Sequence, residues 1–152
     1  MLKVASAGIR IVPAAMAENG ILKIGKVTDF QCHMLEHQLG AYTDCNHGKG
    51  LAVLHPVLYR HYLPEAAPQF ARLAKEVWGI DAVGKTETEM AEAFINALAA
   101  FIKEIGLPTT LKEMNIHEDT DYKAIADSTT LTGGCVKKFE RAELLDILLE
   151  CR

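Results

Sequence analysis

The stretch from Thr86 to Ile105 carries apolar residues three and four positions apart, which is the spacing of one face of an α-helix. Thr86 and Glu89 occupy the two positions of a capping box, whose side chains satisfy backbone N–H groups at a helix start. The apolar positions are Met90, Phe94, Leu98, Phe101 and Ile105. Gly106-Leu107-Pro108 then forms a stop signal, so the sequence predicts one well-delimited amphipathic helix.

Helical spacing recurs along most of the chain, and no segment shows a convincing strand pattern. We therefore expect an all-α fold, a bundle of about seven helices that forms a single domain over residues 1–152. The expected helices run from Pro13 to Gly25-Lys26, from Thr28 or Asp29 to Gly40–Thr43, from His47 (capped by Asn46) to about His61 before Pro64, from Pro68 to Trp78 with Gly79 as the C-cap, from Thr86 to Ile105, from Asp121 to Thr129, and from Glu140 to Cys151.

Composition excludes several classes of protein. Apolar residues make up 49% of the 152 residues and charged residues 24%, which is typical of a globular domain. The net charge of −4, with both signs interspersed, offers no basic patch for nucleic acid. The apolar runs are too short to span a membrane, and the N-terminus lacks the order of a signal peptide. We expect a cytoplasmic protein whose four cysteines are reduced.

Three histidines stand in the segment CHMLEHQLGAYTDCNHG, at His33, His37 and His47. His33 and His37 lie one helical turn apart and share a face, and the ten-residue gap before His47 is long enough for the chain to reverse. Imidazole is the commonest protein ligand for Zn, Fe, Cu and Ni, so the cluster suggests a metal site. Spacing alone also allows histidines that only hydrogen-bond or reach toward solvent.

The other candidate ligands near this segment are better interpreted as ordinary residues. Cys32 and Cys45 each lie within two residues of a cluster histidine, but free cysteine is most often a small buried apolar residue. We interpret His55, His61 and His117 as ordinary helix or surface residues, since none has a partner at ligand spacing.

The segment GKVTDFQCHMLEHQLGAYTDCNHGKGLAVLHPVLYRHY resembles the metal-binding region of the iron-containing (group III) alcohol dehydrogenases, and most of all their butanol dehydrogenase-like branch. The shared features are His-x3-His, the Leu-Gly that follows, the His-Gly ten residues on, and the apolar Ala-Val-Leu…Pro helix. A weaker likeness extends to the C-terminus. The resemblance implies the helical C-terminal domain of that family, which has a dehydroquinate synthase-like fold.

By this resemblance, His33 and His47 match two metal ligands of the family. His37 matches a histidine that lines the catalytic cleft near the nicotinamide ring, which makes it a candidate for proton relay. The implied cofactors are a divalent metal, Fe²⁺ first with Zn²⁺ as the alternative, and NAD(P) in the full-length enzyme. The implied substrate is a small alcohol or aldehyde, with the metal acting as a Lewis acid during hydride transfer.

The family's remaining ligands, an Asp and a His four residues apart, have no counterpart, because no histidine precedes His33. A glycine-rich loop for a dinucleotide is missing as well. We therefore expect a chain without the nucleotide-binding domain and without dehydrogenase activity of its own. Two alternatives remain open: a non-catalytic helical remnant that interacts with other proteins or forms a homo-oligomer, and a helical domain whose histidines have no role.

Overall fold

The computed structural model describes residues 21–133 and 135–152. Their elements are α2 (Ile21–Thr43), α3 (His47–Glu76), α4 (Glu87–Glu104), the 3₁₀ helix η1 (Lys112–Met114), α5 (Tyr122–Ser128) and α6 (Arg141–Glu150). Within these ranges there is no strand, so the all-α prediction is confirmed, with five α-helices instead of about seven. The N-terminal part of the helix expected from Pro13 lies outside the described residues. No helix in the described ranges is long and apolar enough to cross a membrane.

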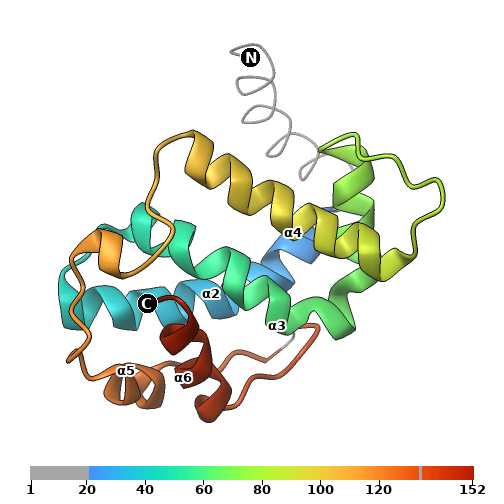
Figure 1. Ribbon diagram of the computed structural model, residues 1–152. Helices are drawn as coiled ribbons and strands as arrows, with labels where there is room; N and C mark the ends of the chain where they lie inside the picture. Colours follow the sequence, from blue (N-terminus) through green and yellow to red (C-terminus); the bar gives the residue numbers. More distant parts are fainter. Residues whose placement is uncertain (1–20, 134) are drawn as a thin grey trace.

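A tight turn joins α2 to α3 and reverses the chain, so that the two helices lie side by side (Figure 1). Asp44 takes the left-handed conformation, with φ of 54°, and its N–H donates to the carbonyl of Gly40 at 2.8 Å. Aspartate tolerates this conformation better than most residues. The Asn46 side chain then accepts from the Lys49 N–H at 3.1 Å, which confirms the predicted N-cap of α3.

The prediction that separate helices flank Pro64 was wrong. Helix α3 continues through Pro64 and Pro68 as one element of 30 residues. Interior prolines each cost about 3 kcal/mol and kink a helix, and Figure 1 shows that α3 changes direction in its second half. Both prolines are exposed, whereas Tyr62, Ala66, Ala67 and Phe70 around them are buried. Burial of this face offsets the lost backbone hydrogen bonds, so the sequence bends the helix without ending it.

The predicted break at Gly25-Lys26 was also wrong, because α2 runs without interruption from Ile21 to Thr43. An interior glycine costs only about 1 kcal/mol relative to alanine, which is too little to end a helix by itself. Gly79, predicted as the C-cap, lies two residues beyond the observed C-cap of α3, Val77. Gly79 has φ of 65°, and its N–H donates to the Lys75 carbonyl at 3.1 Å beyond the last turn.

Helix α4 packs along α3 through an aromatic cluster. The Phe94 ring stacks against Phe70 at 5.3 Å between centroids, and it meets the edge of Trp78 at 5.4 Å. Tyr59 joins from the first half of α3, with its ring 5.1 Å from Phe70. Offset and edge-to-face aromatic pairs add about 0.5–1.5 kcal/mol each beyond their buried area. The capping box of Thr86 and Glu89 is present at the start of α4, as predicted.

Helices α5 and α6 cover the other side of the α2–α3 hairpin, and polar side chains hold them there. The buried Gln31 of α2 donates to the Thr130 carbonyl at 3.2 Å and accepts from the Thr132 N–H at 2.9 Å. Arg141 at the start of α6 donates to the carbonyl of Thr129 at 2.9 Å. These bonds satisfy the irregular backbone after α5 and fix α2 against the C-terminal helices.

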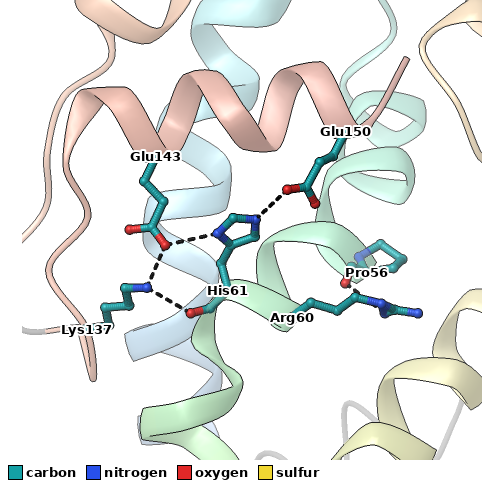
Figure 2. A network of polar contacts seen from close by, with 6 residues as sticks. All are labelled: Pro56, Arg60, His61, Lys137, Glu143 and Glu150. Carbon is teal, nitrogen blue, oxygen red and sulfur yellow. Dashed lines mark hydrogen bonds and ion pairs between the residues drawn. The ribbon is translucent and has the colours of Figure 1, made fainter.

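A second polar network joins α3 to α6 (Figure 2). The ring of His61, on α3, lies between Glu143 and Glu150, with N–O distances of 3.0 and 3.2 Å. Lys137 donates both to Glu143 at 2.6 Å and to the His61 carbonyl at 3.0 Å. His61, which the sequence pattern suggested was an ordinary helix or surface residue, lies outside the histidine cluster and anchors α6 to α3.

We predict that this network makes the fold less stable at acid pH. Partial burial alone would raise the pKa of Glu143, but the hydrogen bonds and charges of Lys137 and His61 outweigh it and lower the pKa. A lowered pKa stabilises the folded state above the unfolded carboxyl pKa of about 4.5, and this stabilisation is lost as the pH falls through the folded value. The free energy of unfolding, measured in urea, should therefore decrease as the pH is lowered from about 5 to about 3. The decrease should be smaller in Glu143→Gln.

The matched control is Glu92→Gln, which neutralises an exposed carboxylate on α4. It should retain the wild-type dependence on pH. An identical drop in wild type and Glu143→Gln would show that the Lys137–His61–Glu143 network has no part in acid stability.

Candidate metal centre

The reversal between α2 and α3 brings the three histidines of the motif together. His33 and His37 lie on one face of α2, and His47 is the first residue of α3. The ring centroid of His47 is 5.4 Å from that of His33 and 5.4 Å from that of His37, and the last two are 6.2 Å apart. The three imidazoles therefore form a compact triangle at one end of the helical hairpin.

A fourth histidine, His55, belongs to the same cluster, although its sequence position predicted an ordinary helix residue. The ring of His55, on α3, lies 6.4 Å from the ring of His33 and 5.3 Å from that of Tyr59. His55 follows His47 by eight residues, a spacing that keeps two side chains near one face of a helix. The eight-residue spacing could have indicated that His55 lies near His47. It indicates a place in the cluster only when α3 is known to pack against α2.

The structure adds a residue that sequence reasoning missed, the carboxylate of Glu36. Its side chain is only 2% exposed, and Oε2 lies in hydrogen-bond contact with Nδ1 of His47. Glu36 stands within a helical stripe otherwise made of Cys32, Leu35 and Leu39, all fully buried. An acidic residue in such an apolar stripe predicts a polar partner, because buried acidic groups are rare unless they are paired. The sequence therefore contained a signal for the role of Glu36.

Gly50 makes room for this carboxylate. A Cβ added at Gly50 would lie 2.6 Å from Oε1 and 2.9 Å from Cγ of Glu36, much closer than real contacts. The first turn of α3 therefore packs directly over the Glu36 side chain, and only glycine fits there. Glycine in a helix costs about 0.5–1 kcal/mol relative to alanine. Gly50 therefore makes α3 slightly less stable as a helix, but it allows α3 to contact the Glu36 side chain.

Cys45 borders the centre as a thiol. Its Sγ lies 3.9 Å from Oε1 of Glu36. Partial burial raises the pKa of Cys45 above its usual value, and the negative charge of Glu36 adds to the effect. Cys32 is fully buried in the core beneath the cluster. The location of Cys32 fits a small apolar residue, whereas the half-buried Cys45 thiol lies against the Glu36 carboxylate.

The centre is open to solvent on one side and closed on the other. His37 is exposed and the His47 side chain is 51% exposed, while Glu36 lies buried beneath them. A pocket of about 420 Å³ lies nearby, between the α2–α3 turn and the segment after η1. Its lining includes Cys45, Asn46 and His117 but none of the four clustered histidines. The imidazoles thus form a surface that another part of a protein could cover.

The donor set and its spacing fit a transition-metal ion. Ligand atoms of Glu36, His37 and His47 all lie within 4.8 Å of one another, and this group does not include the predicted ligand His33. Ring nitrogens that bind one ion at about 2.0–2.1 Å with tetrahedral angles leave ring centroids roughly 5 Å apart. The observed separations of 5.4 Å from His47 to His33 and to His37 are close to that arrangement.

Comparison with known proteins decides the family. Residues 11–150 match the model for the C-terminal domain of the Fe-containing alcohol dehydrogenase family. The chain belongs to this family. The resemblance inferred from the His-x3-His segment is thereby confirmed, and it extends over nearly the whole chain.

Individual relatives agree with this assignment. The chain is 35% identical over 135 residues to "Probable NADH-dependent butanol dehydrogenase 1" of Bacillus subtilis, and 31% identical over 136 residues to NADH-dependent butanol dehydrogenase B of Clostridium acetobutylicum. These alignments cover 88% and 89% of the chain but only 35% of each relative. A crystal structure of 1,3-propanediol oxidoreductase superposes with a TM-score of 0.73 at 29% identity, over 80% of this chain and 32% of that one. The chain therefore corresponds to about a third of a family member.

We predict that Gly50→Ala destabilises the fold by about 1–3 kcal/mol, the usual cost of overpacking, because its Cβ collides with the Glu36 side chain. The matched control is Gly48→Ala in the same helical turn, where a Cβ meets only Asn46 Oδ1 at 3.5 Å. This control should stabilise the helix by up to about 1 kcal/mol. Urea unfolding of both variants checks the prediction, and equal effects at the two positions would contradict the close packing over Glu36.

Proposed function

We propose that the chain is the metal-binding helical domain, a single domain over residues 1–152, of an NAD(P)-dependent alcohol dehydrogenase that interconverts a primary alcohol and its aldehyde. One observation carries the proposal: His33, His37 and His47 converge from two helices in a chain that belongs to the Fe-containing family. Four imidazoles and one buried carboxylate can all offer lone pairs to a metal ion. Packing of a helical hairpin needs apolar side chains instead, so this concentration of polar groups favours a metal site.

In this proposal His33 and His47 hold the divalent metal, with Fe²⁺ as the first choice and Zn²⁺ as the alternative. The bound ion supplies a Lewis acid that polarises the carbonyl oxygen of an aldehyde or stabilises the corresponding alkoxide. His37 is exposed beside His47, and its role is to pass a proton between the substrate oxygen and solvent. In the 152-residue chain alone, His37 also lies near enough to His47 for the two imidazoles to bind one ion.

The rest of the active site lies outside these residues. The sequence offers no glycine-rich loop for a dinucleotide and no histidine before His33, so NAD(P) and the remaining metal ligands belong to another part of the enzyme. The exposed side of the histidine cluster is where that part would dock. A cytoplasmic enzyme without nucleic-acid or membrane partners fits the charge and composition described above.

A second candidate function is a non-catalytic helical protein that binds partners or self-associates. Large apolar side chains on α2 favour it, because Phe30 is 56% exposed and Tyr42 is 51% exposed. Exposed apolar surface of this kind promotes association. Light scattering coupled to size-exclusion chromatography separates the candidates: a stable homo-oligomer that binds no metal would favour the second one.

We predict that the chain, purified without chelator, contains near-stoichiometric divalent metal by mass spectrometry, and that His33→Ala loses most of it. His117→Ala is the matched control, since His117 is exposed and lies in the segment after η1, across the pocket from the α2–α3 turn and outside the histidine cluster. Equal metal content in wild type and His33→Ala would contradict the assignment of His33 as a ligand. The absence of metal in every variant would favour the non-catalytic candidate.

We further predict that the homogeneous 152-residue chain does not reduce butanal with NADH or NADPH, because it carries neither the dinucleotide site nor the remaining ligands. Absorbance at the nicotinamide band measures this directly. Turnover above that of the His33→Ala variant would show that the chain alone assembles a complete active site.

A further inference from the structure

We propose that Glu36 is a positioning residue, which holds Nδ1 of His47 and so directs Nε2 of the same ring toward the metal. This inference rests on the proposed function, because Glu36 can position a metal ligand only if the histidines bind a metal. It assigns a role to a residue beside the metal that is not itself a ligand. Glu36 stands on α2 between His33 and His37, and its buried carboxylate points into the contact with α3.

The carboxylate is committed to protein partners on both of its oxygens. Oε2 pairs with Nδ1 of His47, and Oε1 lies 3.9 Å from the Cys45 thiol. With its side chain only 2% exposed, Glu36 has no access to water that could satisfy its charge instead. A buried carboxylate is stable only when it is paired and hydrogen-bonded, so the His47 ring is its principal partner.

This pairing selects one form of the His47 imidazole. A neutral imidazole carries its proton on either Nδ1 or Nε2, and the nitrogen without the proton offers a lone pair to a metal. A carboxylate at Nδ1 favours the tautomer with the proton on that nitrogen, which leaves Nε2 free to coordinate. Carboxylate–histidine–metal arrangements fix the ring orientation and raise the basicity of the ligand in this way.

The backbone around Glu36 holds the carboxylate in its place. Cβ atoms added at Gly40 and Gly50 would lie 3.7 and 2.6 Å from Oε1, so two glycines, one from each helix, border it. The last turn of α2 and the first turn of α3 thus close over the side chain. Such close packing restricts its rotamers and aims it at His47, which is what a positioning role requires.

The first experiment tests the tautomer in metal-free protein, so its outcome does not depend on whether the chain binds metal. Long-range ¹H–¹⁵N spectra of labelled imidazoles, recorded in mildly alkaline buffer, distinguish protonated from unprotonated ring nitrogens. We expect the proton of His47 on Nδ1 in the wild-type chain and a shift toward Nε2 in Glu36→Ala. Glu36→Gln should retain much of the wild-type pattern, because the amide oxygen also accepts a hydrogen bond. His47 protonated on Nε2 in the wild type, or spectra unchanged in Glu36→Ala, would overturn the proposal.

The second experiment measures Zn²⁺ affinity by calorimetric titration of the same proteins. We expect the dissociation constant to rise about 10–100-fold in Glu36→Ala, the usual effect of losing a group that orients a ligand, with Glu36→Gln between the two. Gly50→Ala, which retains the carboxylate but displaces it, should also weaken binding, while Gly48→Ala should not. If Glu36→Gln loses Zn²⁺ as completely as Glu36→Ala while its tautomer stays wild-type, the carboxylate is itself a ligand and the positioning role is wrong.

Backbone amide spectra establish that each variant is folded before either measurement is interpreted. Failure of the wild-type chain to bind Zn²⁺ would count against the proposed function, whereas the tautomer spectra would still decide the role of Glu36. The two hypotheses can therefore fail separately.

Discussion

The close contact between the end of α2 and the start of α3 is the constraint on which the rest of the centre depends. A left-handed Asp44 reverses the chain, Asn46 starts the next helix, and the missing side chain of Gly50 lets the two helices meet over the Glu36 carboxylate. A longer turn or a larger residue at Gly50 would separate the imidazoles on α2 from those on α3. The geometry of the histidine triangle thus follows from three local features of the backbone.

The energetics of this contact explain why the polar groups are arranged as they are. Burial of an unpaired carboxylate beneath two helices would cost several kcal/mol, and a hydrogen bond from Nδ1 of His47 offsets part of that cost. The same pairing leaves the outer side of the His47 ring exposed, next to His37. One interaction therefore both stabilises the hairpin and presents a ring nitrogen to the open side of the centre.

Sequence reasoning predicted the parts of this structure that depend on local signals. The capping box at Thr86, the N-cap at Asn46 and the left-handed Gly79 are all present, because each reflects the chemistry of one or two neighbouring residues. The division of α3 at Pro64 was wrong, since burial of Tyr62 and Phe70 on either side is a tertiary effect that local rules do not include. The roles of Glu36 and His55 were missed for the same reason: each depends on a contact between α2 and α3. The family was recognisable because its His-x3-His segment is local in sequence.

We infer that the imidazoles of the α2–α3 hairpin form a metal centre in which Glu36 orients His47. A crystal structure of the Zn²⁺-loaded chain, with anomalous diffraction at the zinc edge, tests it most directly. We expect an anomalous peak about 2.0–2.1 Å from Nε2 of His47 and from a ring nitrogen of His33, with Nδ1 of His47 still facing Glu36. A peak bonded to the Glu36 carboxylate, or none between these two rings, would contradict it.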